Sequence, residues 1–256
     1  MFATVEFYER DNRVKSRMKR LMGKSEIVTE RVSLSENEYF YKIRVPVHKN
    51  KYPVSKLRRV ASGVNDGLLF PEGFTDEVGV KVYRSSFFRE ILLFNSAVSL
   101  LEKGGYDPSV TLITLIDKKG FLSSQTERLI PLAGEIRVVT DNVRAYERTA
   151  GRVMEEYGLS LLVSDKLSSI PERGIIISFK SNVIPVYFKG LLITGEKRLL
   201  PFAKVLTGKG IKAEEKYMSL CPSGIDMTDF LSALCEVCFQ KELRKSEYEN
   251  LVDISV

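Results

Sequence analysis

The stretch VTLITLIDKKGFLSS, residues 110–124, decides how this chain folds. Its first part, Val110 to Asp117, is apolar and rich in β-branched residues, which is typical of a strand buried on both faces, as in the centre of a parallel sheet. Ser123 and Ser124 then predict the start of a helix over residues 125–132, because serine is a favoured N-cap residue. The stretch therefore predicts a strand, a turn and a helix in succession.

The succession of strand and helix continues downstream. EIRVVTD, residues 135–141, predicts a second strand, and RAYERTAGRVMEEYG, residues 144–158, has helical spacing and ends in the glycine expected after a helix. Two further apolar strands begin near Leu159 and Gly174. Right-handed crossovers would lay these strands in one sheet. We therefore expect an α/β fold, a Rossmann-like mostly parallel sheet with helices on both faces.

The first turn departs from the pattern of dinucleotide-binding proteins. Their G-x-G-x-x-G turn lets the backbone close on a pyrophosphate at a helix N-terminus, whereas this turn keeps one glycine, Gly120. Lys118 and Lys119 could neutralise a phosphate, and the alternative is an ordinary charged turn. The candidate binding residues in this turn are Asp117, Lys118, Gly120, Ser123 and Ser124.

The second strand ends in Asp141, about twenty residues beyond the first turn, where such folds place a ribose-binding carboxylate. The segment VVTDNVRAYERTAGRVMEEYG, residues 138–158, resembles the second strand and helix of Rossmann-like nicotinamide-dependent enzymes such as shikimate dehydrogenases and glutamyl-tRNA reductases. In those families a hydroxyl or amide followed by arginine favours the phosphorylated cofactor. The resemblance implies that role for Thr140, Asn142 and Arg144. The alternative is that Asp141 and Asn142 cap the helix and that Arg144 is solvated.

Composition limits the class of protein. The chain has 256 residues, of which 44% are hydrophobic and 28% charged, as in globular proteins. No apolar run is long enough to span a bilayer, and the N-terminus lacks the apolar stretch of a signal peptide. Three cysteines do not make a disulfide framework in a chain of this length. We therefore expect a cytoplasmic protein.

The sequence offers little for catalysis or metal binding. His48 is the single histidine, and no G-x-S-x-G nucleophile motif is present, so hydrolase chemistry of the serine or cysteine type is disfavoured. Cys235 and Cys238 form a C-x-x-C, but both share the apolar stripe of an expected helix, which indicates buried thiols rather than zinc ligands. We expect no metal site, and the sequence does not locate a catalytic residue.

The chain divides into two expected domains. Residues 1–84 predict a basic α+β unit, with paired antiparallel strands in SEIVTERVSL and EYFYKIRVPV. Residues 85–256 predict the Rossmann-like domain with a C-terminal helix. The helix expected at residues 11–23 of the first unit is strongly basic and could meet the phosphates of a nucleic acid.

These patterns favour a binding or scaffolding protein without catalysis of its own, compatible with a protein partner. The first alternative is an NAD- or NADP-dependent oxidoreductase, or another nucleotide binder, that uses the two turns described above. The second alternative is nucleic-acid binding through the basic N-terminal helix.

Overall fold

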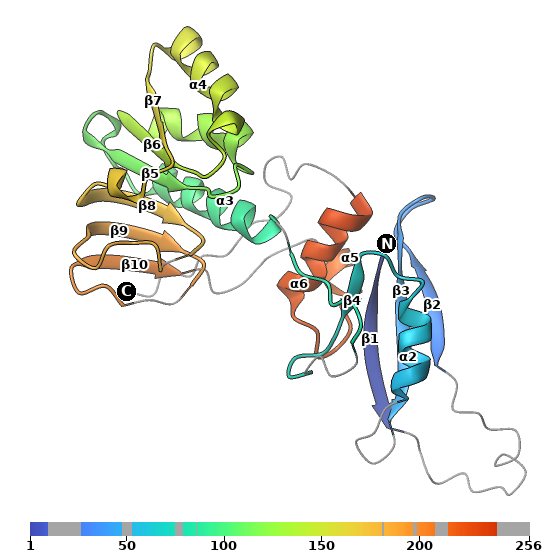
Figure 1. The fold of residues 1–256 in the computed structure, drawn as a ribbon. Helices are drawn as coiled ribbons and strands as arrows, with labels where there is room; N and C mark the ends of the chain where they lie inside the picture. Colours follow the sequence, from blue (N-terminus) through green and yellow to red (C-terminus); the bar gives the residue numbers. More distant parts are fainter. Residues whose placement is uncertain are drawn as a thin grey trace, which may run out of the picture. The chain divides into compact units, whose positions relative to one another are not determined.

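The computed structural model describes residues 1–9, 27–47, 53–74, 79–85, 87–180, 182–196, 199–207 and 215–239. They form two compact units (Figure 1), one made of Met1–Ser86 with Glu214–Glu242 and the other of the chain between Phe87 and Ala213. The basic helix expected at residues 11–23, and with it the proposed nucleic-acid contact, lies outside the described residues.

The first unit has a four-stranded mixed sheet in the order β2-β3-β1-β4. Its strands are β1 (Phe2–Glu9), β2 (Val28–Ser33), β3 (Tyr39–Val47) and β4 (Gly67–Leu69). The antiparallel β2–β3 pair expected from the sequence is confirmed, while β1 runs parallel to both β3 and β4. Helix α2 (Val54–Ala61) buries Leu57 in a core with residues of β1 and β3.

The C-terminal helices belong to the first unit, although the sequence analysis placed them with the second domain. They are α5 (Glu215–Met218), α6 (Met227–Ala233) and the π-helix η4 (Leu234–Phe239). The ring of Phe230 packs edge-on against Phe40, with centroids 5.5 Å apart, and Phe40 stacks on Phe2. All three rings are buried, so this aromatic contact accounts for the grouping.

The second unit contains a six-stranded sheet in the order β10-β9-β8-β5-β6-β7, and every neighbouring pair is parallel (Figure 1). The strands are β5 (Leu112–Ile116), β6 (Glu135–Val139), β7 (Leu161–Ser164), β8 (Arg173–Ser178), β9 (Lys189–Thr194) and β10 (Ala203–Thr207). Counted from β5, the order reads 3-2-1-4-5-6, which is the order of dinucleotide-binding doubly wound sheets. The expected α/β, Rossmann-like fold is confirmed.

The helices of this unit pack on one face of the sheet, whereas the sequence analysis expected helices on both. Helices α3 (Phe88–Lys103) and α4 (Val143–Tyr157) and the 3-10 helix η2 (Ser123–Leu132) share one apolar core with that face. On the other face, the described residues supply only the short 3-10 turn η3 (Leu167–Ser169) and loops. The connections that follow β7, β8 and β9 are short. Each returns the chain to the start of the next parallel strand and leaves no room for a helix of two turns.

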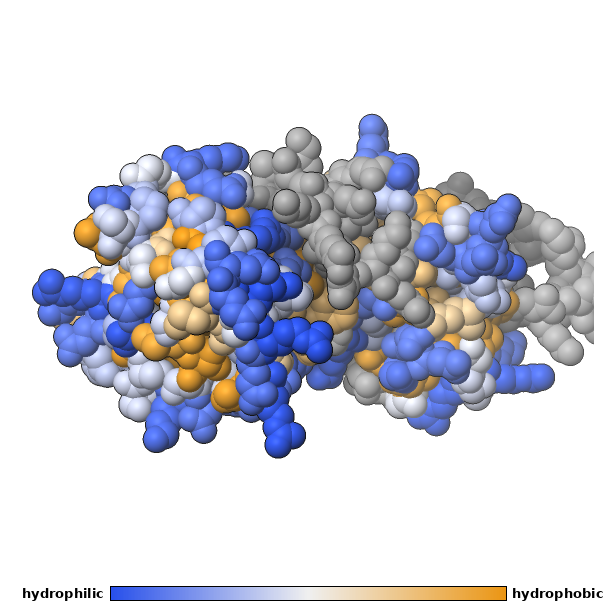
Figure 2. Space-filling view, turned by 90° about the horizontal axis from the view of Figure 1, so that it is seen from above, coloured by the Kyte–Doolittle hydropathy of each residue, from blue (hydrophilic) through white to orange (hydrophobic). Residues whose placement is uncertain are grey.

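Polar side chains cover much of the surface visible in Figure 2, and apolar side chains reach it in small groups. Among the described residues, no helix is both long and apolar enough to cross a membrane.

Candidate functional site

The two turns singled out by the sequence lie together at the carboxyl-terminal edge of the parallel sheet. Strand β5 pairs with β6 on one side and β8 on the other, so the strand order reverses at β5. Open α/β sheets bind ligands at this reversal, outside the carboxyl ends of the strands. The Asp117 N–H donates to the carbonyl of Val139, at the end of β6, which fixes the first turn beside the second.

Asp117 is buried, with 1% of its surface exposed, and its carboxylate is surrounded by donors. One oxygen, Oδ1, accepts hydrogen bonds from the backbone N–H groups of Gly120 at 2.9 Å and Phe121 at 3.1 Å. The other, Oδ2, accepts from the Leu122 N–H at 2.7 Å and from the Tyr146 hydroxyl at 2.8 Å. Each carboxylate oxygen thus accepts two hydrogen bonds. These four bonds compensate for the removal of the carboxylate from water.

The carboxylate of Asp117 therefore accepts N–H groups from the first turn of the sheet, the turn that holds a phosphate in dinucleotide-binding proteins. In those proteins the N–H groups at the start of the first helix point at the pyrophosphate. Here the N–H groups of Gly120, Phe121 and Leu122 point at Asp117. Burial, together with the nearby negative charge of Asp117, raises the pKa of Tyr146, so its hydroxyl keeps its proton and remains a donor.

Neither serine of the turn caps the helix that follows, which corrects the expectation from the sequence. The helix is a 3-10 helix that begins at Ser123, with Leu122 at the N-cap position and no side-chain capping bond. The carbonyl of Ser123 accepts a hydrogen bond from the Thr149 hydroxyl at 3.0 Å, and Ser124 is exposed. Asp117, at the end of β5, instead accepts the N–H of Leu122, the residue at the N-cap position.

Lys118 and Asp141 neutralise each other across the two turns. The Lys118 Nζ lies 2.8 Å from the Asp141 Oδ1, and the Asp141 N–H donates to the Lys118 carbonyl at 3.1 Å. The Asp141 side chain is still 67% exposed. Asp141 therefore lies at the surface with the Lys118 cation already beside it.

Gly120 and Asn142 make the contact between the turns close. The Asn142 Nδ2 donates to the Lys119 carbonyl at 3.2 Å. Its side chain makes no capping bond to α4, so the alternative in which Asn142 caps this helix is wrong. Gly120 has φ +79°, and a Cβ placed there would meet the Ala145 Cβ at 2.8 Å. A glycine is required at this position by both its backbone conformation and its neighbour.

The residues implied by the family resemblance lie near one another but differ in accessibility. Thr140 is buried, and its Oγ1 accepts a hydrogen bond from the Asn142 N–H at 3.0 Å. Arg144 is exposed in the first turn of α4 and forms no salt bridge with a described residue. Of these three, only Asn142 and Arg144 present a side chain at the surface.

Sequence reasoning missed Tyr146 and Glu90. Tyr146, Thr149 and Val153 are the buried positions of α4, and this i, i+3, i+7 spacing could have singled out Tyr146. Glu90 lies in the first turn of α3. Burial, and next the charge of Asp117, raises the pKa of Glu90, while Lys119 and Lys180 oppose that shift. No sequence pattern connects Glu90 with the turn after β5.

The described residues contain no group of three or more His, Cys, Asp or Glu side chains that could hold a metal ion, and His48 lies outside them. Of the C-x-x-C pair, Cys235 is buried and Cys238 half-buried. Burial raises the pKa of the Cys238 thiol to about 11, and the thiol donates to the Tyr39 carbonyl. This thiol is therefore protonated at neutral pH and is a poor nucleophile.

No protein-family model and no curated protein sequence matches this chain. Among solved structures, a shikimate 5-dehydrogenase-like protein is similar with a TM-score of 0.27 and 11% identity, over 78% of this chain and 79% of that one. The L-tryptophan dehydrogenase from Nostoc punctiforme is similar with a TM-score of 0.26 and 9% identity, over 91% of this chain and 70% of that one. The weak Rossmann-like resemblance expected from the sequence is confirmed for the fold alone. The strand order of the six-stranded sheet is the observation that defines this fold.

Proposed function

We propose that this chain is a binding or scaffolding protein without catalysis of its own, in which a Rossmann-like unit serves as a framework. The observation that carries the proposal is the buried carboxylate of Asp117, which takes up the N–H groups of Gly120, Phe121 and Leu122. The first turn therefore has an internal anion where a nucleotide-binding turn has an empty cradle.

A dinucleotide would have to displace that anion or lie beside it. Hydrogen bonds to a charged group contribute about 1.5–3 kcal/mol each, so breaking several of them to admit a pyrophosphate is unfavourable. Leaving them in place would set the pyrophosphate near a buried negative charge, with the N–H groups of Gly120, Phe121 and Leu122 already bonded to that charge. Both routes argue against binding of NAD or NADP in the usual position.

Thermal unfolding with and without dinucleotides tests the proposal, because a ligand that binds only the folded state must stabilise it. We expect no change in Tm with saturating NAD, NADP, ATP or S-adenosylmethionine. A dehydrogenase with an intact glycine-rich turn, measured in parallel with its own cofactor, is the positive control. A clear rise in Tm of this protein with NAD or NADP would refute the proposal.

The second candidate is nucleotide binding, including NAD- or NADP-dependent oxidation, centred on the second turn. It is supported by Asp141, whose side chain is 67% exposed at the end of β6, and by the exposed Arg144 nearby. In this case a dinucleotide raises Tm of the wild type, and Asp141→Ala and Arg144→Ala remove that rise while leaving the ligand-free Tm nearly unchanged.

A cytoplasmic location is part of the proposal. It is supported by the chemistry of the cysteines, since Cys221, Cys235 and Cys238 are thiols rather than members of a disulfide. Fluorescence imaging of the tagged full-length protein, with fractionation of the cell extract, tests the location. Recovery in a secreted or periplasmic fraction would contradict it.

A further inference from the structure

Strand β2 forms an open edge of the sheet in the first unit. It lies at one end of the strand order, next to β3, and no described segment pairs with its other side (Figure 1). All residues of the strand are exposed except Val32, which is half-buried. Both faces of β2 are therefore in contact with solvent, and its outer edge has no described neighbour.

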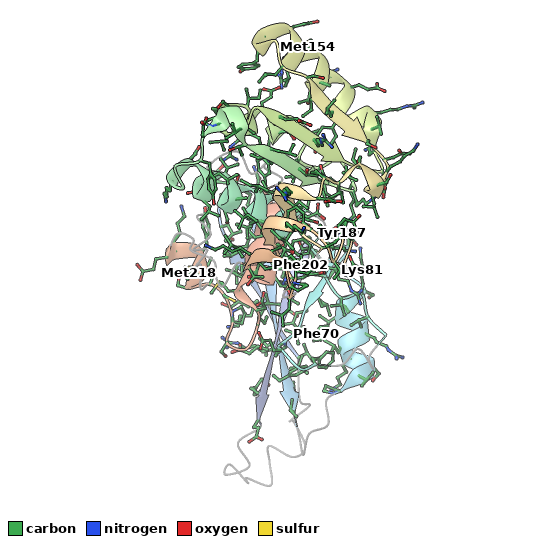
Figure 3. The ribbon with its side chains drawn as sticks, turned by 90° about the vertical axis from the view of Figure 1, so that its left-hand side faces the viewer. Phe70, Lys81, Met154, Tyr187, Phe202 and Met218 are labelled. Carbon is green, nitrogen blue, oxygen red and sulfur yellow. The ribbon has the colours of Figure 1, made fainter. Side chains whose placement is uncertain are left out.

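The opposite edge of the same sheet is closed. The Leu68 N–H of β4 donates to the Lys81 carbonyl at 2.8 Å, and the Tyr83 N–H donates to the Leu68 carbonyl at 2.9 Å. Lys81, which is labelled in Figure 3, therefore belongs to a segment that covers this edge. Natural sheets protect their edges with short strands, covering segments, prolines, bulges or charges. The three-residue β4 has the first two of these devices, whereas the longer β2 has only its charges, Glu30 and Arg31.

The hydrogen bonding of the β2–β3 pair shows which backbone groups of β2 face outward. At the end of the pair, the Leu34 N–H donates to the Glu38 carbonyl at 2.8 Å, and these two residues continue the register of the strands. In an antiparallel pair, residues that bond to the neighbouring strand alternate with residues that do not. The N–H and carbonyl groups that point away from β3 therefore belong to Thr29, Arg31 and Ser33.

The two charged side chains of β2 differ in what compensates them. The Glu30 carboxylate lies 4.0 Å from the Arg44 guanidinium of β3. The Arg31 guanidinium lies 3.8 Å from the centre of the Tyr39 ring, and no carboxylate of the described residues forms a salt bridge with it. Opposite charges directly across two strands are favourable, and like charges are unfavourable. An added strand is therefore favoured when it places a carboxylate opposite Arg31.

A second copy of β2 does not supply that carboxylate. Residues that face each other across two strands lie on the same side of the sheet, and this restricts the registers open to an antiparallel two-fold pair. The two registers that overlap most of the strand place either Glu30 or Arg31 directly opposite its own counterpart. Both set like charges across the strands, and the other registers leave at least half of β2 unpaired. The edge therefore fits a segment of a different protein better than a second copy.

We propose that the outer edge of β2 takes an extended segment of another protein as an additional antiparallel strand, with a carboxylate of that segment opposite Arg31. Backbone hydrogen bonds to Thr29, Arg31 and Ser33 provide the affinity, and the side chains opposite Arg31 and Glu30 provide the specificity. This surface belongs to the first unit, so the inference goes beyond the proposed function and does not depend on the turn that contains Asp117. A rise in Tm with NADP would refute the proposed function and leave strand addition at β2 unaffected.

Fluorescence anisotropy of a labelled peptide with the full-length protein tests strand addition. The probe is Thr-Val-Glu-Lys-Thr-Val, which places its glutamate opposite Arg31 and its lysine opposite Glu30 when it lies antiparallel to β2. One matched peptide replaces the glutamate by lysine. A second has N-methyl groups on its first, third and fifth residues, whose N–H groups would face β2. We expect the wild type to bind the probe and to bind neither matched peptide as well.

Variants of the full chain locate the binding on β2. Arg31→Glu should weaken binding of the probe about three- to tenfold, and this variant should bind the lysine-substituted peptide better than the wild type does. Arg148→Glu, an equal charge change at an exposed position of α4, should have no effect. Thr29→Pro removes an outward N–H without removing a bond to β3, so it should abolish binding. Circular dichroism and Tm confirm that each variant is folded, and Arg31→Glu with the N-methylated peptide decides the question if Thr29→Pro does not fold.

Strand addition at β2 is overturned by any of three results with the peptides. They are no binding of the probe, equal binding of the probe and its N-methylated form, and binding that Arg31→Glu leaves unchanged. Equal binding of the glutamate and lysine peptides to the wild type would refute the carboxylate opposite Arg31. Sedimentation velocity tests the other occupant, because a wild-type dimer that Thr29→Pro converts to a monomer would assign the edge to a second copy and refute the proposal.

Discussion

The hydroxyl of Tyr146 donates a 2.8 Å hydrogen bond to the carboxylate of Asp117, and both residues are buried. Asp117 follows β5 and Tyr146 lies in the first turns of α4, so the bond joins the first turn of the sheet to the second helix of the unit. The N–H groups of the turn contact the same carboxylate. Asp117 is therefore a structural centre of the region where related folds hold a ligand.

Removing the Tyr146 hydroxyl should destabilise the fold while leaving the ring in place. For Tyr146→Phe we expect a loss of about 1–3 kcal/mol in the free energy of unfolding, because a buried charged acceptor loses a donor. Urea-induced unfolding followed by circular dichroism measures it. Tyr157→Phe is the control, since Tyr157 is 52% exposed on the same helix. Equal stabilities of the Tyr146 and Tyr157 variants would contradict a structural role for this bond.

Gly120→Ala should lower the free energy of unfolding by more than the backbone conformation at this position alone explains. A positive φ costs a non-glycine residue about 1–3 kcal/mol. At Gly120 the new Cβ would also meet the Ala145 Cβ at 2.8 Å. Gly105→Ala is the matched control, because Gly105 has φ +64° and nothing within 4 Å of an added Cβ. Unfolding curves of the two variants should differ, with Gly120→Ala the less stable, and equal losses would argue against close packing of the two turns.

The Lys118–Asp141 ion pair should contribute little to stability, because the Asp141 side chain is 67% exposed. We expect a coupling of about 0.2–1 kcal/mol from a double-mutant cycle of Lys118→Met and Asp141→Asn, shrinking at high salt. The cycle is measured by urea unfolding at low and high sodium chloride. A coupling that is large and independent of salt would show that the pair is more shielded from solvent than its exposure indicates.

Glu90 should make stability depend on pH in a defined direction. Burial raises the pKa of Glu90 above the ordinary value of a glutamate in the folded protein, so folding disfavours its ionised form. The resulting loss in the free energy of unfolding is absent below the pKa that Glu90 has in the unfolded chain. It develops as pH rises through the pKa that Glu90 has in the folded protein. We therefore expect Glu90→Gln to be more stable than the wild type at neutral pH, with the difference vanishing in acid. Glu147→Gln, at an exposed position of α4, is the control for these unfolding measurements, and a Glu90 difference that is constant with pH would contradict the argument.

The candidate site could be predicted only in part. Asp117, Lys118, Gly120, Asp141 and Asn142 do meet at one edge of the sheet, as the carboxyl ends of neighbouring parallel strands must. What each side chain does there did not follow from the pattern. The sequence pattern makes Asp117 a ligand-binding candidate and the serines caps, whereas the Asp117 carboxylate itself accepts the N–H groups of the turn.

The sequence by itself determined the parallel sheet, the second helix with its terminal Gly158, and the antiparallel β2–β3 pair. These follow from local patterns, namely apolar runs, helical spacing and glycine after a helix. Only the tertiary structure decided that Asp117 faces inward to Tyr146, that the helices cover one face of the sheet, and that Phe230 packs with Phe2 and Phe40. Each of these depends on which residues distant in the chain come into contact, and the burial and hydrogen bonding that favour those contacts arise only when the chain has folded.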